Sequence, residues 1–337
     1  MGNVLKIGIL GTGNIAARAL VAPAREVPEL SVDAVASRDP GRASAYAESQ
    51  GIPRAMGYEA LLADAAVDIV YITLPPSMHA EWSLRALRAG KHVLCEKPMA
   101  ANAAQARAVA DAVRGGRQVY MEAFHYPYHP FAKRVRDVLD TRAIGALQSA
   151  EANFQIPGKF IATGNIRRQS ALGGGAMMDA GCYPLHVLRG LLGEVEEVLE
   201  GVADTDAADP QVDLSMRATL RFAGGRTGRL HASFLAEEKA AVNVTVRGSA
   251  GVLEIESLYV PQWGGGLAMR WDGHAYAEKA DATPSYVFQL RELVRCVRDG
   301  APVLTSADDG VRNMAAIDTI YRKAGLEVRC AGHAGVL

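Results

Sequence analysis

A lysine flanked by a glutamate and a proline ends an apolar run of the chain. Glu96, Lys97 and Pro98 directly follow the residues HVLC at 92–95. Paired charges at a strand end usually face solvent, so the motif is either a polar strand end or a rigid support that holds a lysine over a reactive group. The rest of the sequence must decide between these two interpretations.

A second stretch, GGGAMMDAGCYPLH at residues 173–186, carries a carboxylate, a phenol and an imidazole. If the segment after the glycines is helical, Asp179, Tyr183 and His186 occupy positions i, i+4 and i+7 on one face. Pro184 predicts a kink or a restart of this helix, at little cost within its first turns. The alternative is an ordinary polar helix face turned to solvent.

The elements that must position the lysine alternate between strands and helices. The predicted strands are VLKIGIL (4–10), LSVDAVAS (30–37), VDIVYITL (67–74), KHVLCE (91–96) and QVYMEAF (118–124). Such alternation predicts a parallel sheet covered by helices on both faces. Because ligands gather at the carboxyl ends of such strands, the loops after residues 74 and 96 should face one crevice.

The residues Gly11-Thr12-Gly13-Asn14-Ile15-Ala16 stand between the first strand and the first helix. They have the G-x-G-x-x-G/A form, which predicts a dinucleotide-binding loop in this context. Gly11 would allow the tight turn, Gly13 would let the backbone approach a pyrophosphate, and Ala16 would allow close packing of helix and sheet. The alternative is a small-residue turn without a ligand.

The end of the second strand indicates which dinucleotide is bound. An acidic residue there would bind the ribose hydroxyls of NAD, whereas this strand ends in Ser37 and Arg38. A hydroxyl and a guanidinium suit a 2′-phosphate, so we predict NADP(H), with Arg42 as further support. Asp39 keeps the NAD reading open, and ordinary surface charge is the alternative for Arg38.

The pattern changes after about residue 125. Long strand-like runs appear at LQSAEANFQI, QVDLSMRATLRF, RTGRLHASFLA, AVNVTVRG and GVLEIES, with helices at 177–192, 286–298 and 311–323. The predicted fold is an α/β Rossmann doubly wound parallel sheet at residues 1–125, followed at 126–337 by an α+β domain with a large open, mainly antiparallel sheet for substrate binding and oligomerisation. Few helices are available to cover that sheet, so we expect a homodimer or homotetramer formed through it.

Bulk properties exclude several classes of protein. The 337 residues exceed the size of one hydrophobic core, and 36 Lys and Arg balance 37 Asp and Glu, which argues against a nucleic-acid partner. The four cysteines are widely spaced, so neither a disulfide framework nor a metal site is expected. No uncharged run reaches the roughly 18 residues that cross a membrane. The N-terminal run continues into glycines without a cleavage site, so we expect a cytoplasmic protein.

In these motifs the chain resembles the Gfo/Idh/MocA (glucose-fructose oxidoreductase/inositol dehydrogenase) family over nearly its whole length. The glycine loop at 11–16, the strand-end Glu96-Lys97-Pro98, and Asp179 with Tyr183 match the family pattern in order. Many members carry histidine where Tyr183 stands. The tyrosine, with the stretches 121–124 and 129–130, resembles dimeric dihydrodiol dehydrogenases, NADP-dependent xylose dehydrogenases, glucose-fructose oxidoreductase and sugar 3-ketoreductases.

This resemblance implies a hydride transfer between the nicotinamide and a hydroxyl or carbonyl carbon. Tyr183 would be the acid/base, and Lys97 would stabilise its phenolate, because a phenol with a pKa near 10 is a weak base at neutral pH. Glu96 would orient the loop, and Pro98, following a cis bond, would fix the lysine. Lys97 and Tyr183 would thus form the catalytic pair.

The resemblance also implies a substrate-binding set and a cofactor-binding set. Asp179, His186, Phe124 and Arg167, or its neighbour Arg168, would bind a sugar or a related polyol or diol. The predicted NADP(H)-binding residues are Gly11, Thr12, Gly13, Asn14, Ile15, Ser37, Arg38, Leu74, Pro75, His79, Glu96 and Lys97. For His79, satisfying local backbone is an equal alternative.

Three other functions remain open at this point. A ketoreductase of a nucleotide-linked keto-sugar would use the same residues, and Lys159, Arg167 and Arg168 could bind its carrier or be surface charge. A non-catalytic NADP-binding sensor would be expected to lose Lys97 or Tyr183, and both are present. Redox-assisted glycosidase or lyase chemistry occurs in relatives that hold NAD tightly. Ser37 and Arg38, which favour NADP(H), argue against this function here.

Overall fold

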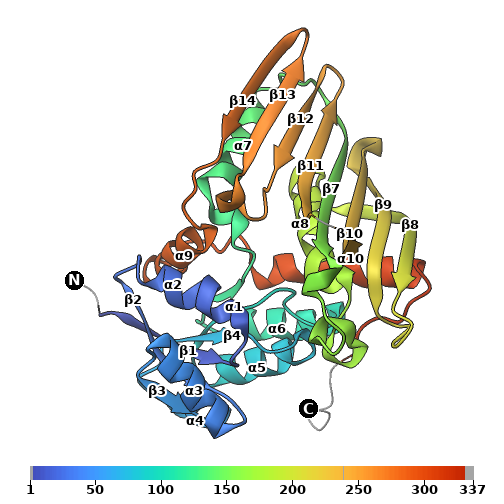
Figure 1. Cartoon of the computed structure of the whole chain (residues 1–337). Coiled ribbons are helices and arrows are strands. Elements are labelled where there is room, and N and C mark those ends of the chain that lie inside the picture. Colours follow the sequence, from blue (N-terminus) through green and yellow to red (C-terminus); the bar gives the residue numbers. More distant parts are fainter. Residues whose placement is uncertain (1–2, 238, 331–337) are drawn as a thin grey trace. The chain divides into compact units, whose positions relative to one another are not determined.

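The computed structural model describes residues 3–237 and 239–330 (Figure 1). Its contacts divide the chain into two compact units. The first comprises Met1–Tyr128 and Pro284–Val311, and the second comprises His129–Thr283 and Arg312–Leu337.

A parallel sheet forms the centre of the first unit. Its strands are β1 (Leu5–Leu10), β2 (Leu30–Ala36), β3 (Arg54–Met56), β4 (Ile69–Ile72), β5 (His92–Cys95) and β6 (Tyr120–Glu122), in the order β3-β2-β1-β4-β5-β6. Every pair in it is parallel. The central strands β4, β5 and β6 are almost entirely buried, as expected where helices cover both faces, whereas the short edge strand β3 is not. This order confirms the predicted doubly wound Rossmann sheet.

The helices of this unit begin at residues that suit helix starts. They are α1 (Asn14–Ala16), continued by a π-helical turn at Ala17–Val21 and by α2 (Ala22–Ala24), then α3 (Pro40–Gln50), α4 (Tyr58–Ala63), α5 (Pro76–Arg88) and α6 (Ala103–Arg114). Asn102 caps α6, its side chain accepting a hydrogen bond from the backbone N of Gln105 at 3.0 Å. Proline occupies the first position of α3 and α5, where its missing N–H costs little.

Helix α9 (Ser285–Asp299) belongs to the first unit, although the sequence placed this segment in the second domain. Its apolar face carries Tyr286, Leu290 and Leu293, which are buried in one core with Ile7 and Leu20. The helix lies against α2 (Figure 1). Sequence order alone predicted one boundary near residue 125. The observed boundary at Tyr128 lies close to that position, but the chain returns to the first unit at Pro284.

The second unit is built on an eight-stranded sheet. Its strands are β7 (Leu147–Pro157), β8 (Val195–Thr205), β9 (Asp213–Phe222), β10 (Thr227–Ala236), β11 (Ala241–Gly248), β12 (Gly251–Glu256), β13 (Gly266–Trp271) and β14 (His274–Lys279). The order is β14-β13-β12-β11-β7-β10-β9-β8, and only the β7–β10 pair is parallel. The predicted large, mainly antiparallel open sheet is therefore confirmed.

The two faces of this sheet differ in polarity. One face buries apolar residues such as Ala152, Ala232 and Val244, and α8 (Cys182–Leu192) packs on it over β7 and β10. On the other face Asn153 Nδ2 donates to Asn243 Oδ1 at 2.9 Å. This second face is thus polar. If a partner binds there, burial of apolar surface is not the driving force.

The remaining helices of the chain are α7 (Pro130–Asp140), which His129 caps, and α10 (Ala307–Lys323), whose residues from Arg312 onward belong to the second unit. Short 3₁₀ turns stand at Tyr126–Tyr128, Gly158–Phe160, Ile166–Arg168, Ser170–Leu172, Ala223–Gly225 and Pro261–Trp263. In residues 3–237 and 239–330, every helix is too short or too polar to cross a membrane.

Candidate active site

The turn between β1 and α1 has the geometry that a pyrophosphate-binding loop needs. Gly11 has a φ of 103°, which side-chain-bearing residues rarely adopt. A Cβ on Gly11 or on Gly13 would lie 2.9 or 3.1 Å from Oγ1 of Thr73, so both glycines hold the loop close to the end of β4. Gly13 is the N-cap of the helix that begins at Asn14, and no side chain of the described residues caps it. The first backbone N–H groups are thus available to an anion.

Local hydrogen bonds hold the polar residues at the end of β2. Ser37 is 6% exposed, and its Oγ accepts a hydrogen bond from the backbone N of Asp39 at 3.3 Å. Asp39 in turn caps α3, with its Oδ1 accepting from the backbone N of Arg42 at 3.1 Å. This carboxylate is therefore engaged at a helix start. Arg38 is exposed beside Tyr58, and burial raises the pKa of Tyr58 while the charge of Arg38 opposes the rise.

The loop that carries Lys97 is tied to two neighbouring strands. Glu96 is only 9% exposed, and the hydroxyl of Tyr71 on β4 donates to its Oε1 at 2.5 Å. The Lys97–Pro98 peptide bond is cis, as predicted. The backbone N of Met99 then donates to Oε1 of Glu122 on β6 at 2.8 Å. Glu96 is therefore not part of a polar strand end that faces solvent, and Lys97 is itself partly buried.

His79 on α5 bridges the loops that follow β4 and β5. It is 1% exposed, with Nδ1 2.7 Å from the carbonyl oxygen of Pro98 and Nε2 2.7 Å from that of Leu74. Burial lowers the pKa of His79 to about 4 against these two contacts, and the charge of Lys97 adds to the decrease. Both ring nitrogens face backbone oxygens, so His79 fixes the two loops relative to each other.

The segment after the glycine triplet begins with a widened helical turn. Met177–Gly181 is π-helical, and α8 continues directly from Cys182. Pro184 has no N–H to donate to the carbonyl of Ala180, four residues earlier, and the π turn stands just before it. The predicted kink or restart is thus a change from π-helical to α-helical winding. The i, i+4 and i+7 spacing therefore does not describe an ideal α-helical face here.

Two of the predicted substrate contacts pair with each other in the second unit. Nε of Arg167 lies 2.6 Å from Oδ2 of Asp179, with the two side chains 40% and 18% exposed. Backbone bonds reinforce the pair, because Gly175 N donates to the carbonyl of Arg167 at 2.9 Å and Asp179 N donates to that of Gly175 at 3.0 Å. The loop with Arg167 and the turn with Asp179 are therefore bonded to each other through both side chains and backbone.

Tyr183 lies among aromatic rings that the sequence analysis did not single out. Its ring centroid is 5.5 Å from that of Phe154 on β7 and 5.6 Å from that of Tyr259, and these two rings stack on each other at 5.3 Å. Tyr183 is 6% exposed and Tyr259 is fully buried. Phe154 and Tyr259 are distant in sequence from Tyr183, so no spacing rule points to them.

The positions of the other predicted site residues do not test their predicted roles. His186 is partly buried on α8, and Phe124 is fully buried just after β6, its backbone N donating to the carbonyl of Glu122 at 2.8 Å. Lys97 and Tyr183 belong to different units. Their pairing, and the substrate contacts of His186 and Phe124, remain predictions.

Comparison with known proteins identifies the family. Residues 5–124 match the model of an oxidoreductase family with an NAD-binding Rossmann fold, and residues 132–254 match the GFO/IDH/MocA C-terminal domain. The D-xylose 1-dehydrogenase (NADP(+)) 2 of Haloferax volcanii is 36% identical over 325 residues, which cover 95% of this chain and 97% of that enzyme. The chain belongs to the Gfo/Idh/MocA family of oxidoreductases. The predicted family and enzyme class are thereby confirmed.

Other members of the Gfo/Idh/MocA family act on nucleotide-linked sugars. The dTDP-3,4-didehydro-2,6-dideoxy-alpha-D-glucose 3-reductase of Actinomadura kijaniata is 33% identical, over 94% of this chain and 95% of that enzyme. The crystal structure of KijD10, a 3-ketoreductase from the same organism in complex with NADP and TDP-benzene, has a TM-score of 0.86 and 32% identity, covering 94% of this chain and 96% of that one.

Proposed function

We propose that the chain is an NADP(H)-dependent oxidoreductase that acts on a hydroxyl or carbonyl carbon of a sugar or a related polyol or diol. When bound, NADP(H) supplies or accepts the hydride. The residues of the chain bind and orient both reactants and move the proton. The observation that carries the proposal is the setting of Tyr183, a nearly buried phenol on the helical segment that also carries Asp179, the ion-pair partner of Arg167.

The cofactor assignment is supported by the ends of two strands. Gly11 and Gly13 keep the backbone free of side chains where a pyrophosphate would approach. At the end of β2 the carboxylate of Asp39 is engaged as a helix cap, and the neighbouring Ser37 and cationic Arg38 are the groups whose chemistry suits a 2′-phosphate. A diphosphate and a 2′-phosphate together are the features of NADP(H).

Tyr183 exchanges the proton with the substrate oxygen in this mechanism. The rings of Phe154 and Tyr259 beside it are apolar surroundings that disfavour a phenolate, so an ammonium group is needed to stabilise the charge. Lys97 is assigned that role. The hydrogen bonds from Tyr71 to Glu96 and from Met99 to Glu122 hold its loop in place, which keeps the cost of orienting the ammonium low.

Asp179, Arg167 and His186 bind the substrate's hydroxyl groups. A carboxylate and a guanidinium already paired at 2.6 Å offer an acceptor and donors in a fixed arrangement. A substrate that lacks the matching hydroxyl would leave one of these groups unpaired in a partly buried site and bind less well. Phe124 completes the predicted set.

A ketoreductase of a nucleotide-linked keto-sugar is the second candidate function. It is favoured by the similarity to the 3-reductase of Actinomadura kijaniata and to KijD10. Of the cations that could bind a carrier, Arg168 is engaged, since its Nε lies 2.6 Å from Oδ2 of Asp206, whose side chain is 4% exposed. Arg167 is also paired, with Asp179, but its side chain is 40% exposed against 26% for Arg168, so Arg167 and Lys159 are the preferred candidates for a carrier phosphate.

A substrate panel separates the two functions. The absorbance of NADPH and NADP+ is followed with free aldoses, with trans-dihydrodiols and with dTDP-linked keto-sugars, using wild-type protein and the Tyr183→Phe variant. Turnover of free aldoses or diols supports the first function, and turnover of the nucleotide-linked sugar alone supports the second. Protein that binds NADPH but turns over no member of the panel would contradict both functions.

We also infer that the protein is cytoplasmic and forms a homodimer or homotetramer through the open sheet of the second unit. The polar face of that sheet carries paired side chains, including Ser215 Oγ 3.2 Å from Nε2 of His231, whose Nδ1 lies 3.1 Å from Nε2 of Gln155. A second copy of the face would offer complementary donors and acceptors, so the interface would be polar.

A further inference from the structure

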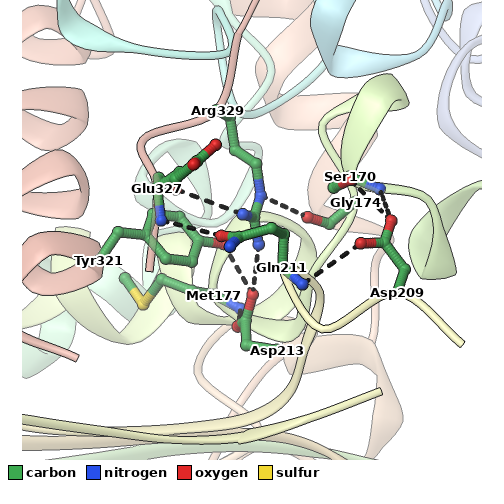
Figure 2. Close-up of polar contacts among 9 residues, drawn as sticks. All are labelled: Ser170, Gly174, Met177, Asp209, Gln211, Asp213, Tyr321, Glu327 and Arg329. Carbon is green, nitrogen blue, oxygen red and sulfur yellow. Dashed lines mark hydrogen bonds and ion pairs between the residues drawn. The ribbon is translucent and has the colours of Figure 1, made fainter. Parts of the chain in front are cut away.

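An ion pair is buried in the second unit, apart from the residues assigned to the site. Nη2 of Arg329 lies 2.9 Å from Oδ1 of Asp213, the first residue of β9, with the side chains 2% and 0% exposed (Figure 2). The hydroxyl of Tyr321 on α10 donates to the same oxygen at 2.9 Å, and the guanidinium lies 4.2 Å from the centre of its ring. Charges are rarely this buried unless they are paired, and such pairs add little net stability.

Both members of the pair also bond the glycine-rich loop. Nε of Arg329 donates to the carbonyl oxygen of Gly174 at 2.9 Å, and Oδ2 of Asp213 accepts from the backbone N of Met177 at 2.6 Å (Figure 2). Met177 is the first residue of the π-helical turn, where backbone N–H groups have no acceptor within the helix. Asp213 therefore caps the turn from a distant strand, and Arg329 fixes the residues just before it.

The glycine triplet allows this close approach. Gly175 has a φ of 129°, and a Cβ there would lie 2.1 Å from Oδ1 of Asp213 and 2.9 Å from the hydroxyl of Tyr321. A Cβ on Gly174 would lie 2.7 Å from the carbonyl oxygen of Arg167. Any side chain at Gly175 would displace the carboxylate, so the loop sequence and the ion pair require each other.

We propose that Asp213 and Arg329 are positioning residues for the reaction. They hold the turn at 174–177 so that Asp179, two residues beyond it, and Tyr183, on the next turn, meet the substrate in one orientation. The inference rests on the proposed function. The path is continuous, because the backbone of Gly175 bonds to both Arg167 and Asp179, and Gly175 lies between the two residues that the ion pair holds.

The Asp213→Asn variant tests the proposal with little change of shape. Its amide oxygen can still accept from Met177, but the charge that orients Arg329 is lost. Misplacing reacting groups by about 1 Å can cost about 10²-fold in rate, so we expect kcat to fall at least tenfold, with KM and the Kd for NADPH within about threefold of wild type. A purely structural pair would lower the melting temperature and leave kcat unchanged.

Gln211→Ala is the matched control. Oε1 of Gln211 accepts from the backbone N of Glu327 at 2.9 Å, so this variant loosens the same C-terminal segment without touching the turn (Figure 2). We expect it to lower the melting temperature while kcat stays within about twofold of wild type. Arg329→Lys is a second test variant, which keeps a buried cation but lacks the planar fork that reaches both Gly174 and Asp213.

The outcomes separate this inference from the proposed function. If Asp213→Asn is too unstable to purify, Arg329→Lys decides the question by the same kinetic criterion. Folded Asp213→Asn or Arg329→Lys protein with the kcat of the Gln211→Ala control would overturn the inference, as would a parallel loss of NADPH affinity. Tyr183→Phe is measured alongside them: if it retains turnover, the proposed acid/base is wrong, whatever the ion pair does.

Discussion

Tyr183 is subject to two opposing demands at the scale of the single residue. Its burial among Phe154 and Tyr259 disfavours a charged phenolate, whereas proton transfer at neutral pH requires that phenolate to be accessible. In the proposed mechanism the ammonium group of Lys97 resolves this conflict by stabilising the phenolate. Catalysis would therefore be more sensitive to either side chain than cofactor binding is.

We expect Tyr183→Phe and Lys97→Ala each to lower kcat by about 10²-fold to 10⁴-fold, the range for general acid–base groups, while the Kd for NADPH stays within a few-fold. Steady-state kinetics and fluorescence titration of NADPH measure the two quantities. Tyr276→Phe, on the exposed strand β14, is the control and should leave both unchanged. A Tyr183→Phe enzyme with most of its activity would rule out the phenol as the acid/base.

The cofactor preference depends on two neighbouring residues. The double variant Ser37→Ala with Arg38→Ala should raise the KM for NADPH by at least tenfold and that for NADH by less than about threefold, because only NADPH carries the 2′-phosphate. Parallel kinetics with both cofactors give the comparison. Arg25→Ala, an exposed arginine at the end of α2, is the control. Equal losses for both cofactors would refute the assignment.

Residue types were predictable from the sequence at this scale, whereas their partners were not. The glycine loop, Glu96-Lys97-Pro98 and Asp179 were predicted from local spacing. The hydrogen bonds from Tyr71 to Glu96 and from Arg167 to Asp179 join residues whose separation in sequence follows no fixed pattern. The cap formed by Asp39 was readable in principle, since an aspartate directly before a helix-starting proline is a common N-cap signal.

At the scale of elements, His79 links the loops after β4 and β5 through two backbone carbonyls. Its folded-state pKa of about 4 lies below the ordinary value of 6.5. Between these two pH values the unfolded chain binds a proton that the folded chain does not. The free energy of unfolding that the neutral His79 contributes is therefore fully present above about pH 6.5, and this contribution is lost as the pH falls toward 4.

We expect His79→Gln to remove this pH dependence. Urea denaturation measures the free energy of unfolding, which should be higher for wild type than for the variant at about pH 7. This difference should narrow by up to about 3 kcal/mol toward pH 4.5. His274→Gln, at the exposed start of β14, should show no such narrowing. A difference for His79→Gln that is constant with pH would contradict the assignment of a depressed pKa.

Elements were predicted unevenly for physical reasons. The buried parallel strands stand out as apolar runs, so all but the short β3 were found. The edge strands β8 and β14 are mostly exposed and carry polar residues, so neither shows an apolar alternation. The π-helical turn at Met177–Gly181 depends on Pro184 and on the distant Asp213, which sequence periodicity does not report.

At the scale of the whole molecule, the polar sheet face in the second unit should form the subunit contact. Light scattering should give a dimeric or tetrameric mass, and His231→Glu should shift it toward the monomer, because a carboxylate would replace the ring between Ser215 and Gln155. Glu29→Gln, in the first unit, is the control. A monomeric wild-type protein at micromolar concentration would contradict this prediction.

The first unit is completed by a segment that the chain reaches only after finishing most of the second. The apolar face of α9 fills a core whose other members lie within the first 128 residues. During translation, the sheet of the second unit can therefore form on the ribosome before residues 285–299 have emerged. A fragment ending at Tyr128 would expose the surface that α9 covers, so nascent or truncated chains should depend on chaperones until α9 is synthesised.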